Sequence, residues 1–247
     1  MKLNSNIKTA IRVAKIELNS MFYSPVAWLV LVIFGFQIGM SFAQIYGEQL
    51  RYQDMGYDLW SVTSGVYTGM RGILPPIQRY IYLYIPLITM GLMSREYQSG
   101  SIKLLYSSPV KNTSIIIGKF LSMMVYGGAL IAVLGVFVIF SAITIVNFDY
   151  PLVLSGMLGL YLLILAYSAI GLFMSSITKY QVVAAIGTLA VLAVLNFIGD
   201  VGQDYDLVRH ITYWLSITGR AYPFIDGLIA SDNIFYFLIV IGFFLAL

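Results

Sequence analysis

The chain has 247 residues, of which 60% are hydrophobic and only 10% are charged, and its formal net charge is +3. This composition excludes a soluble globular domain and indicates a polytopic membrane protein, long enough for about six helical spans of roughly 20 residues each. The absence of cysteine excludes disulfides and thiolate metal sites, and the single histidine, His210, leaves little material for a zinc or haem site.

Residues 1–22 are expected to form an amphipathic helix that lies in the membrane interface. Apolar residues recur there at steps of three or four, while Lys8, Arg12 and Lys15 occupy the opposite face. A soluble helix packed on a partner is the alternative. Ser24 followed by Pro25 is typical of the start of a new helix, because serine caps helix N-termini and proline suits the first turn.

The apolar runs that follow predict an all-α integral membrane protein, folded as a single domain over residues 1–247 with six transmembrane helices. Polar segments at about 46–76 and 199–233 are expected to lie outside the membrane. The spans are expected at about 25–44, 77–93, 114–146, 152–177, 182–198 and 234–247, the last of them continuing beyond the chain given.

The distribution of basic residues predicts the orientation of these spans. With the N-terminus in the cytosol and alternating spans, nine of the 14 lysine and arginine residues lie inside and five lie outside. The acidic residues on the inside are then Glu17 and Glu96 alone. The positive-inside rule favours this arrangement, with a cytoplasmic N-terminus.

A polar stretch at residues 95–109 separates two long apolar runs and organises the rest of the chain. Gly100 followed by Ser101 permits a sharp change of direction, after which Leu104 and Leu105 give a short helix its apolar side and Pro109 ends it. The stretch therefore predicts a short amphipathic helix at the membrane surface, through which a soluble partner can push on the buried helices.

The spacing of this stretch resembles the cytoplasmic-loop signature of the permease subunits of type-2 ABC transporters. The residues that carry the resemblance are Arg95, Glu96, Gly100, Ser101, Leu105 and Pro109. It implies the transmembrane subunit of an exporter-like, ATP-driven transporter, whose separate ATP-binding subunit holds ATP and magnesium and docks on this loop as a coupling helix. Glu96 would then meet a cation of that subunit, and Leu104 and Leu105 would fill its surface groove. The family usually has an acidic residue near position 103, where this chain has Lys103.

Two further runs resemble the same family. Residues 23–28 are similar to the entry into its first span, which follows an interfacial elbow helix. Residues 224–237 are similar to the run before the final span in the gliding-motility and nitrous-oxide-maturation (copper-processing) branch. The resemblance implies a multi-pass protein of the bacterial inner membrane.

No catalytic, cofactor or metal site is expected in this chain. Paired intramembrane acids are absent, and His210 falls in an external segment. Gly118 and Lys119 do not form a phosphate-binding loop, because position 113 is Thr rather than Gly and Phe120 follows the lysine. We also expect no ionisable group in the span interiors, where an ion-coupled transporter would hold its coupling ion. The energy for transport must therefore come from an ATPase partner.

Small residues suggest where helices approach closely. Gly35 with Gly39 and Gly171 with Ser175 are candidates either for contact with a second permease, a copy or a paralogue, or for packing within one chain. The external segments suggest a periplasmic or cell-surface partner. Membrane lipids are expected partners and nucleic acid is not. The alternative functions are a scaffold that transmits force without transporting a solute, and a channel.

Overall fold

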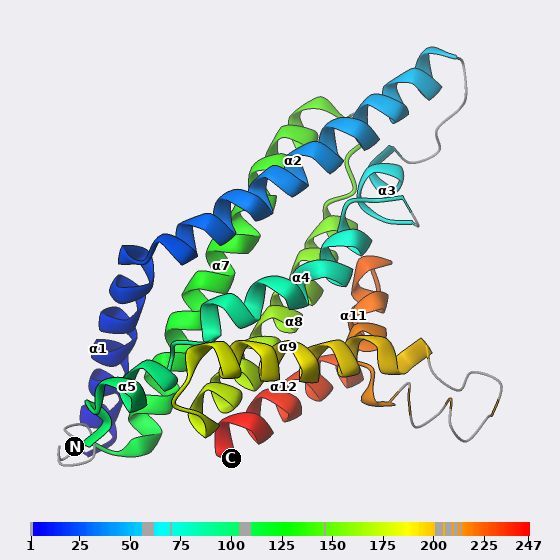
Figure 1. Cartoon of the computed structure of the whole chain (residues 1–247). Coiled ribbons are helices and arrows are strands. Elements are labelled where there is room, and N and C mark those ends of the chain that lie inside the picture. The colour runs from blue at the N-terminus through cyan, green and yellow to red at the C-terminus, as the bar shows by residue number, and fades with distance from the viewer. Residues whose placement is uncertain are drawn as a thin grey trace.

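The computed structural model shows an all-helical chain (Figure 1). It describes residues 2–55, 62–69, 71–103, 110–145, 147–200, 205, 209, 212 and 214–247. The α-helices among these residues are α1 (Lys2–Tyr23), α2 (Pro25–Asp54), α3 (Val62–Tyr67), α4 (Leu74–Thr89), α5 (Ser94–Ser99), α7 (Asn112–Thr144), α8 (Tyr150–Ile177), α9 (Gln181–Phe197), α11 (Ile217–Ile225) and α12 (Ser231–Ala246), and a 3-10 turn, Ile198–Asp200, follows α9.

The long helices run alternately between two ends of the molecule (Figure 1). The N-terminus, α5 and the last turn of α12 lie at one end, which we call the α5 end. The far end of α2 lies at the other, with α3 and α11, and we call it the α3 end. Each of α2, α7 and α9 leads away from the α5 end, and each of α4, α8 and α12 leads back to it.

Three of the described helices are long and apolar enough to cross a membrane, over Pro25–Tyr52, Asn112–Thr144 and Tyr150–Ile177. The apolar helices α9 and α12 have 17 and 16 residues, and α4 has 16. At 1.5 Å per residue these shorter helices measure about 25 Å, against a hydrocarbon layer of about 30 Å. The expected all-helical membrane fold is therefore confirmed, and length alone supports three of the six expected spans.

The helix boundaries follow the hydropathy pattern except around α2 and α4. Helices α7, α8, α9 and α12 begin and end within three residues of the expected spans. Helix α2 continues to Asp54, ten residues past the expected end at residue 44. The first of its extra turns packs on α7, where the ring of Tyr46 contacts the ring of Phe140.

Helix α8 forms the centre of the fold. It packs against α4, α7, α9, α11 and α12, and it is buried along most of its length. Two hydroxyls in this core are satisfied locally: those of Ser168 and Thr188 donate to carbonyls one turn earlier in their own helices, at 2.7 Å. This pattern keeps a hydroxyl paired without water, as an apolar surrounding requires.

The short helix α3 is anchored under α7 by a buried tyrosine. The Tyr67 hydroxyl lies 2.8 Å from Ser141 Oγ and donates to the Phe137 carbonyl at 3.1 Å. Burial raises the pKa of Tyr67 to about 12, so its hydroxyl stays protonated near neutral pH.

Helix α4 ends at Thr89, four residues before the expected end of the second span, because a side chain of α8 replaces its broken backbone bonds. Ser175 Oγ accepts from the backbone N–H groups of Met93 and Ser94 at 3.0 and 3.1 Å and donates to the Met90 carbonyl at 2.9 Å. One turn earlier on α8, a Cβ added at Gly171 would lie 2.7 Å from Thr89 Cβ. Helix α8 therefore needs a small residue at both positions to reach the break.

Gly171→Ala is expected to lower the free energy of unfolding by about 1–3 kcal/mol, because the added methyl group overpacks the contact with Thr89. Thermal unfolding of the detergent-purified protein measures the loss. The control is Gly128→Ala on α7, whose Cβ would meet nothing within 4 Å. Equal stability of the two variants would contradict the close approach of α8 to α4.

Candidate functional site: the α1–α5–α7 junction

Helix α1 lies along the first turns of α7 rather than standing apart from the chain. Ala10 and Met21 are buried, and a Cβ added at Gly118 of α7 would lie 2.7 Å from the Ala10 carbonyl oxygen. The stripe that contains Ile7 and Ile11 stays about half exposed, at 52% and 56%. One side of α1 therefore packs on its own chain, and an apolar stripe beside its basic residues remains open.

Helix α5 has six residues and ends in a sharp turn. Gly100 follows it with φ of +73°, in the left-handed region that glycine adopts without strain. The hydroxyls of Ser99 and Ser101 lie 2.8 Å apart across this turn, and the side chains of both residues are exposed. Gly100 and Ser101 thus form the expected change of direction. Leu104, Leu105 and Pro109 lie outside the described residues.

The buried ammonium of Lys119 joins the three helices. The Lys119 side chain is 1% exposed, and its Nζ lies 2.8 Å from Glu17 Oε2 on α1 and 2.7 Å from Glu96 Oε1 on α5. It also donates to the Leu92 carbonyl at 2.5 Å, in the break between α4 and α5. An ammonium group has three hydrogen-bond donors, and each of them has an acceptor here. We call the side chains of Lys119, Glu17 and Glu96 the Lys119 cluster.

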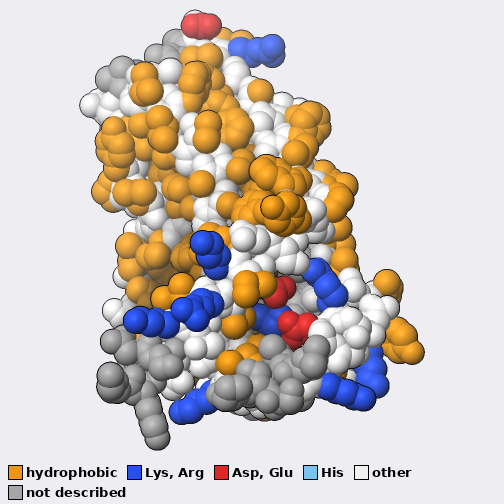
Figure 2. Space-filling view, turned by 90° about the vertical axis from the view of Figure 1, so that its left-hand side faces the viewer, with side chains coloured by type: hydrophobic (Ala, Val, Ile, Leu, Met, Phe, Trp, Pro, Cys, Tyr) orange, Lys and Arg blue, Asp and Glu red, His pale blue; other side chains and the backbone are white. Residues whose placement is uncertain are grey.

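A second contact fastens α5 beside the Lys119 cluster. The Arg95 guanidinium donates to Ser20 Oγ of α1 at 2.8 Å. The adjacent Arg95 and Glu96 therefore hold the first turn of α5 to α1 and α7. Figure 2 shows the surface around this junction, with acidic and basic side chains gathered below a broad hydrophobic band.

One sequence expectation is corrected at this junction. We expected no ionisable group in the span interiors, yet Lys119, within the expected third span, is buried. Two carboxylates on neighbouring helices compensate a cation that would otherwise be too costly to bury. The expected contact of Glu96 with a cation of a partner stays a prediction, and within this chain the Glu96 carboxylate is paired with Lys119.

The cluster carries one ammonium and two carboxylates, so its formal charge is −1. Glu96 Oε2 is buried and has no hydrogen-bond partner among the described residues. Glu96 lies in the first turn of α5, where the helix dipole favours a negative charge. The arrangement therefore depends on Lys119, because without it two carboxylates would face each other in a confined space.

The small-residue candidates all contact helices of their own chain. A Cβ at Gly35 would lie 3.3 Å from Val133 and one at Gly39 would lie 3.5 Å from Phe137, both on α7. Gly171 and Ser175 are buried against the break after α4. These four positions pack within one chain in this structure, and their contact with a second permease stays a prediction.

A second buried cation, at the α3 end, was missed by sequence reasoning, which placed it in an external loop. Arg220 of α11 is 6% exposed, and its NH1 lies 3.4 Å from Asp232 Oδ2 and 3.2 Å from Asn233 Oδ1. Its guanidinium lies 4.5 Å from the centre of the Trp214 ring. Arg220 thus links α11 to the start of α12. The periodicity of the local sequence does not predict that Arg220 pairs with Asp232.

Comparison with known proteins identifies one family. Residues 11–203 match the model of the family described as ABC-2 family transporter protein. The matched range includes every side chain of the Lys119 cluster and its Arg95–Ser20 neighbour. No curated protein matches the chain.

Lys119→Met is expected to lower the free energy of unfolding by about 3–5 kcal/mol, because removal of one partner strands the buried carboxylates. Adding Glu17→Gln and Glu96→Gln to Lys119→Met should recover much of this loss by removing the stranded charges. Thermal unfolding in detergent compares the two proteins.

The control for this experiment is Lys111→Met, which removes an exposed lysine near the same end of α7. If Lys119→Met costs no more stability than Lys111→Met, the cluster does not hold the junction together.

Proposed function

The chain belongs to the ABC-2 transporter family and is the membrane subunit of such a transporter, and we propose that its α1–α5–α7 junction carries the movement of a separate ATP-binding subunit into the membrane helices. Permeases of this family lack an ATPase domain and generally pair with ATP-binding subunits. In this proposal ATP and magnesium bind to that partner, which docks on α5 and the loop that follows it.

The observation that carries the proposal is the position of Lys119 between α1, α5 and α7. A displacement of α5 moves Glu96, which is in ion-pair contact with Lys119 on the 33-residue helix α7. The same ammonium holds Glu17 on α1. A push on the six residues of α5 therefore reaches α1 and a long membrane helix through one buried group.

The bend between α1 and α2 extends this path to a second long helix. Trp28 Nε1 donates to the Phe22 carbonyl across the bend, and Tyr126 of α7 donates to the Ala27 carbonyl, both at 2.8 Å. Helix α1 consequently does not hinge freely against α2. Movement of α1 is passed to α2, which begins at Pro25.

The proposed docking surface is the exposed side of α5 and the turn after it. Gln98, Ser99, Gly100, Ser101 and Lys103 are exposed there. Glu96, by contrast, points to the inside of the chain, and its proposed role is to transmit movement rather than to bind the partner. Leu104, Leu105 and Pro109 complete the proposed contact on the strength of the family resemblance.

We further propose six spans, with the N-terminus in the cytosol of a bacterial cell and the protein in its inner membrane. Alternation of the long helices between the α5 end and the α3 end supports this count, because each helix returns the chain to the opposite end (Figure 1). Assignment to the gliding-motility and nitrous-oxide-maturation branch rests on the run 224–237 alone.

A second permease, identical or paralogous, is proposed to pair with this one, so that two ATP-binding subunits find two docking loops. With Gly35 and Gly39 turned toward α7, the surface of α2 available for pairing is its exposed apolar side, which includes Val32, Phe36 and Met40. An external protein partner is proposed only from the length of the external segments.

The tagged chain, purified in mild detergent, is expected to bring with it an ATP-binding protein that hydrolyses ATP. Ser101→Trp places a bulky side chain on the exposed turn and should abolish this co-purification. Glu96→Gln should retain the partner, because Glu96 is not part of the docking surface, and should weaken the dependence of ATP hydrolysis on the permease.

The control for this experiment is Met55→Trp, which adds the same side chain at an exposed position near the α3 end. Absence of any ATPase with the native chain would remove the energy source that we propose. Loss of the partner in Met55→Trp as well would show that Ser101→Trp acts through folding and not through docking.

The orientation is tested by single-cysteine labelling, which has no background because the native chain contains no cysteine. Ser99→Cys should react with a membrane-impermeant maleimide only in inside-out vesicles, and Met55→Cys only in right-side-out vesicles. The reverse pattern would invert the proposed topology, and labelling of both from one side would contradict the crossing of α4.

A further inference from the structure

The break between α4 and α5 is a place where two sets of hydrogen bonds compete for the same backbone groups. In an uninterrupted α-helix each N–H group donates to the carbonyl four residues earlier, so those of Met93 and Ser94 would donate to Thr89 and Met90. In this structure both N–H groups donate to Ser175 Oγ of α8, at 3.0 and 3.1 Å. One hydroxyl of α8 therefore takes the place of two helical carbonyls.

The carbonyl groups that the break leaves without helical partners are paired as well. The Thr89 carbonyl accepts from the Leu92 N–H at 3.1 Å, over three residues as in a 3-10 helix. The Met90 carbonyl accepts from Ser175 Oγ at 2.9 Å and from the Ser94 hydroxyl. The broken arrangement therefore supplies partners to the donors and acceptors that it takes from the helix.

A continuous helix would satisfy these groups equally well. The N–H groups and carbonyls of the break would then pair with each other, and the Ser175 hydroxyl would donate to the carbonyl one turn earlier in α8, as that of Ser168 does. The Leu92 carbonyl, which accepts from Lys119, has two lone pairs and accepts a helical N–H in addition. Closing the break thus exchanges hydrogen bonds without losing them.

The change of backbone that closes the break is small. Met90, with φ of −53° and ψ of −35°, and Met93, with φ of −117° and ψ of −38°, already lie in the right-handed helical region. Gly91 and Leu92 lie between them, and glycine changes its backbone angles at little cost. A rearrangement of this short segment therefore suffices to join α4 to α5.

A joined helix also has the length that α4 lacks. At 1.5 Å per residue, a helix from Leu74 to Ser99 measures about 39 Å, against about 25 Å for α4 alone. The hydrocarbon layer is about 30 Å thick. The longer helix crosses it completely, whereas α4 by itself does not.

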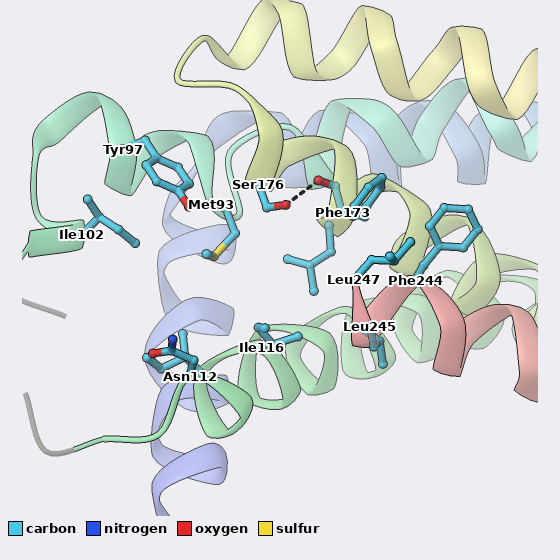
Figure 3. A pocket seen from close by; sticks show the side chains of 12 residues that line it. Met93, Tyr97, Ile102, Asn112, Ile116, Phe173, Ser176, Phe244, Leu245 and Leu247 are labelled. Carbon is cyan, nitrogen blue, oxygen red and sulfur yellow. Dashed lines mark hydrogen bonds between the residues drawn. The ribbon is translucent and has the colours of Figure 1, made fainter. Parts of the chain in front are cut away.

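In the broken arrangement α5 is held against α8 and α9. Figure 3 shows the side chain of Met93 beside Ser176, which follows Ser175 at the end of α8. Gln181 Nε2, at the start of α9, donates to Gln98 Oε1 of α5 at 3.3 Å. A rearrangement at residues 90–93 changes the position of everything that follows in α5, and so acts on both contacts.

The contacts of α5 with α8 are weaker than its contacts with α1 and α7. Ser175 binds neutral backbone groups, whereas Glu96 pairs with Lys119 and the Arg95 guanidinium donates to Ser20 of α1. Hydrogen bonds with a charged partner are roughly twice as strong as those between neutral groups. When α5 moves, it therefore separates from Ser175 more readily than from α1 and α7.

We propose that the α4–α5 break is a two-state switch. In one state Ser175 holds the N–H groups of Met93 and Ser94 and the helix is broken; in the other Ser175 releases them and α4 and α5 form one continuous helix. Two arrangements that both satisfy their buried backbone groups suit a two-state element. The role of the switch in coupling rests on the function proposed above, because α5 carries the docking surface for the ATP-binding subunit.

Cross-linking in the cysteine-free chain tests the switch. Cysteines in place of Gln98 and Gln181 lie close together in the broken state and should be joined rapidly by a short, reducible bis-methanethiosulfonate. Adding Ser175→Ala removes the hydroxyl that holds the break open. It should lower the rate of cross-linking about fivefold or more, because α5 then spends more time in the continuous helix.

Gly91→Ala is a second variant, and it removes no side-chain hydrogen bond. Alanine favours a helix at this position over glycine, and the atom nearest to its added Cβ is the flexible end of Arg95, at 2.9 Å. This variant should also lower the cross-linking rate, by about threefold to fivefold. Its result does not depend on the stability of Ser175→Ala.

Two matched controls should cross-link at the native rate. Ser168→Ala removes a buried hydroxyl of α8 that bonds only within its own helix, and Gly128→Ala adds a methyl group to α7 where it meets nothing within 4 Å. Equal rates in Ser175→Ala and Ser168→Ala, or no slowing in Gly91→Ala relative to Gly128→Ala, would overturn the switch.

The role in coupling is tested separately, on the complex with the co-purified ATP-binding protein. The cross-link between positions 98 and 181 locks the broken state, so it should abolish permease-dependent ATP hydrolysis, and a reductant should restore it. Hydrolysis that ignores the cross-link would overturn this role alone. Absence of any ATP-binding partner would contradict the proposed function and not the switch, which the cross-linking rates decide without a partner.

Discussion

The arrangement of the α5 end depends on the need to compensate the buried charge of Lys119. An unpaired ammonium in a low-dielectric surrounding costs several kcal/mol, so its neighbours must supply acceptors. Glu17 sets which side of α1 faces α7, and Glu96 sets the position of the first turn of α5. The third acceptor, the Leu92 carbonyl, lies in the break after α4. The same break thus separates α5 from α4 and supplies an acceptor to the cation that holds α5.

The distribution of burial divides the molecule into a packed centre and a looser side. Helix α8 is buried along most of its length, whereas α2 and α7 are largely exposed. The Lys119 cluster links α5 to α1 and α7, and α1 leads directly into α2. A movement of α5 therefore acts first on helices that have few neighbours to resist it, while α8 and the helices packed on it provide a fixed reference.

Hydropathy and local turn chemistry predicted much of this fold, but they did not predict the ion pairs between residues that are far apart in the sequence. The apolar runs located α7, α8, α9 and α12, and Gly100 located the turn after α5, because these signals are local in sequence. The partners of Lys119 are about 100 and 23 residues away from it in the chain, and no periodicity connects Glu17 with Glu96. A buried lysine near the end of a span looks the same in sequence as one that snorkels to water. The extension of α2 past residue 44 was missed because its residues are polar, and the contact of Tyr46 with Phe140 of α7 is distant in sequence.

An apolar cluster at the junction would hold three helices together at least as well, since buried ion pairs contribute little net stability compared with hydrophobic packing. The charged cluster differs in how it responds to displacement. Lys119 is held at once by Glu96 of α5, by Glu17 of α1 and by the Leu92 carbonyl. Separation of any one of these groups stretches a charge-assisted contact, and a buried charge that loses its partner is costly. In the coupling that we propose, a displacement of α5 is therefore easier when α1 and α7 follow it than when the Glu96 pair breaks.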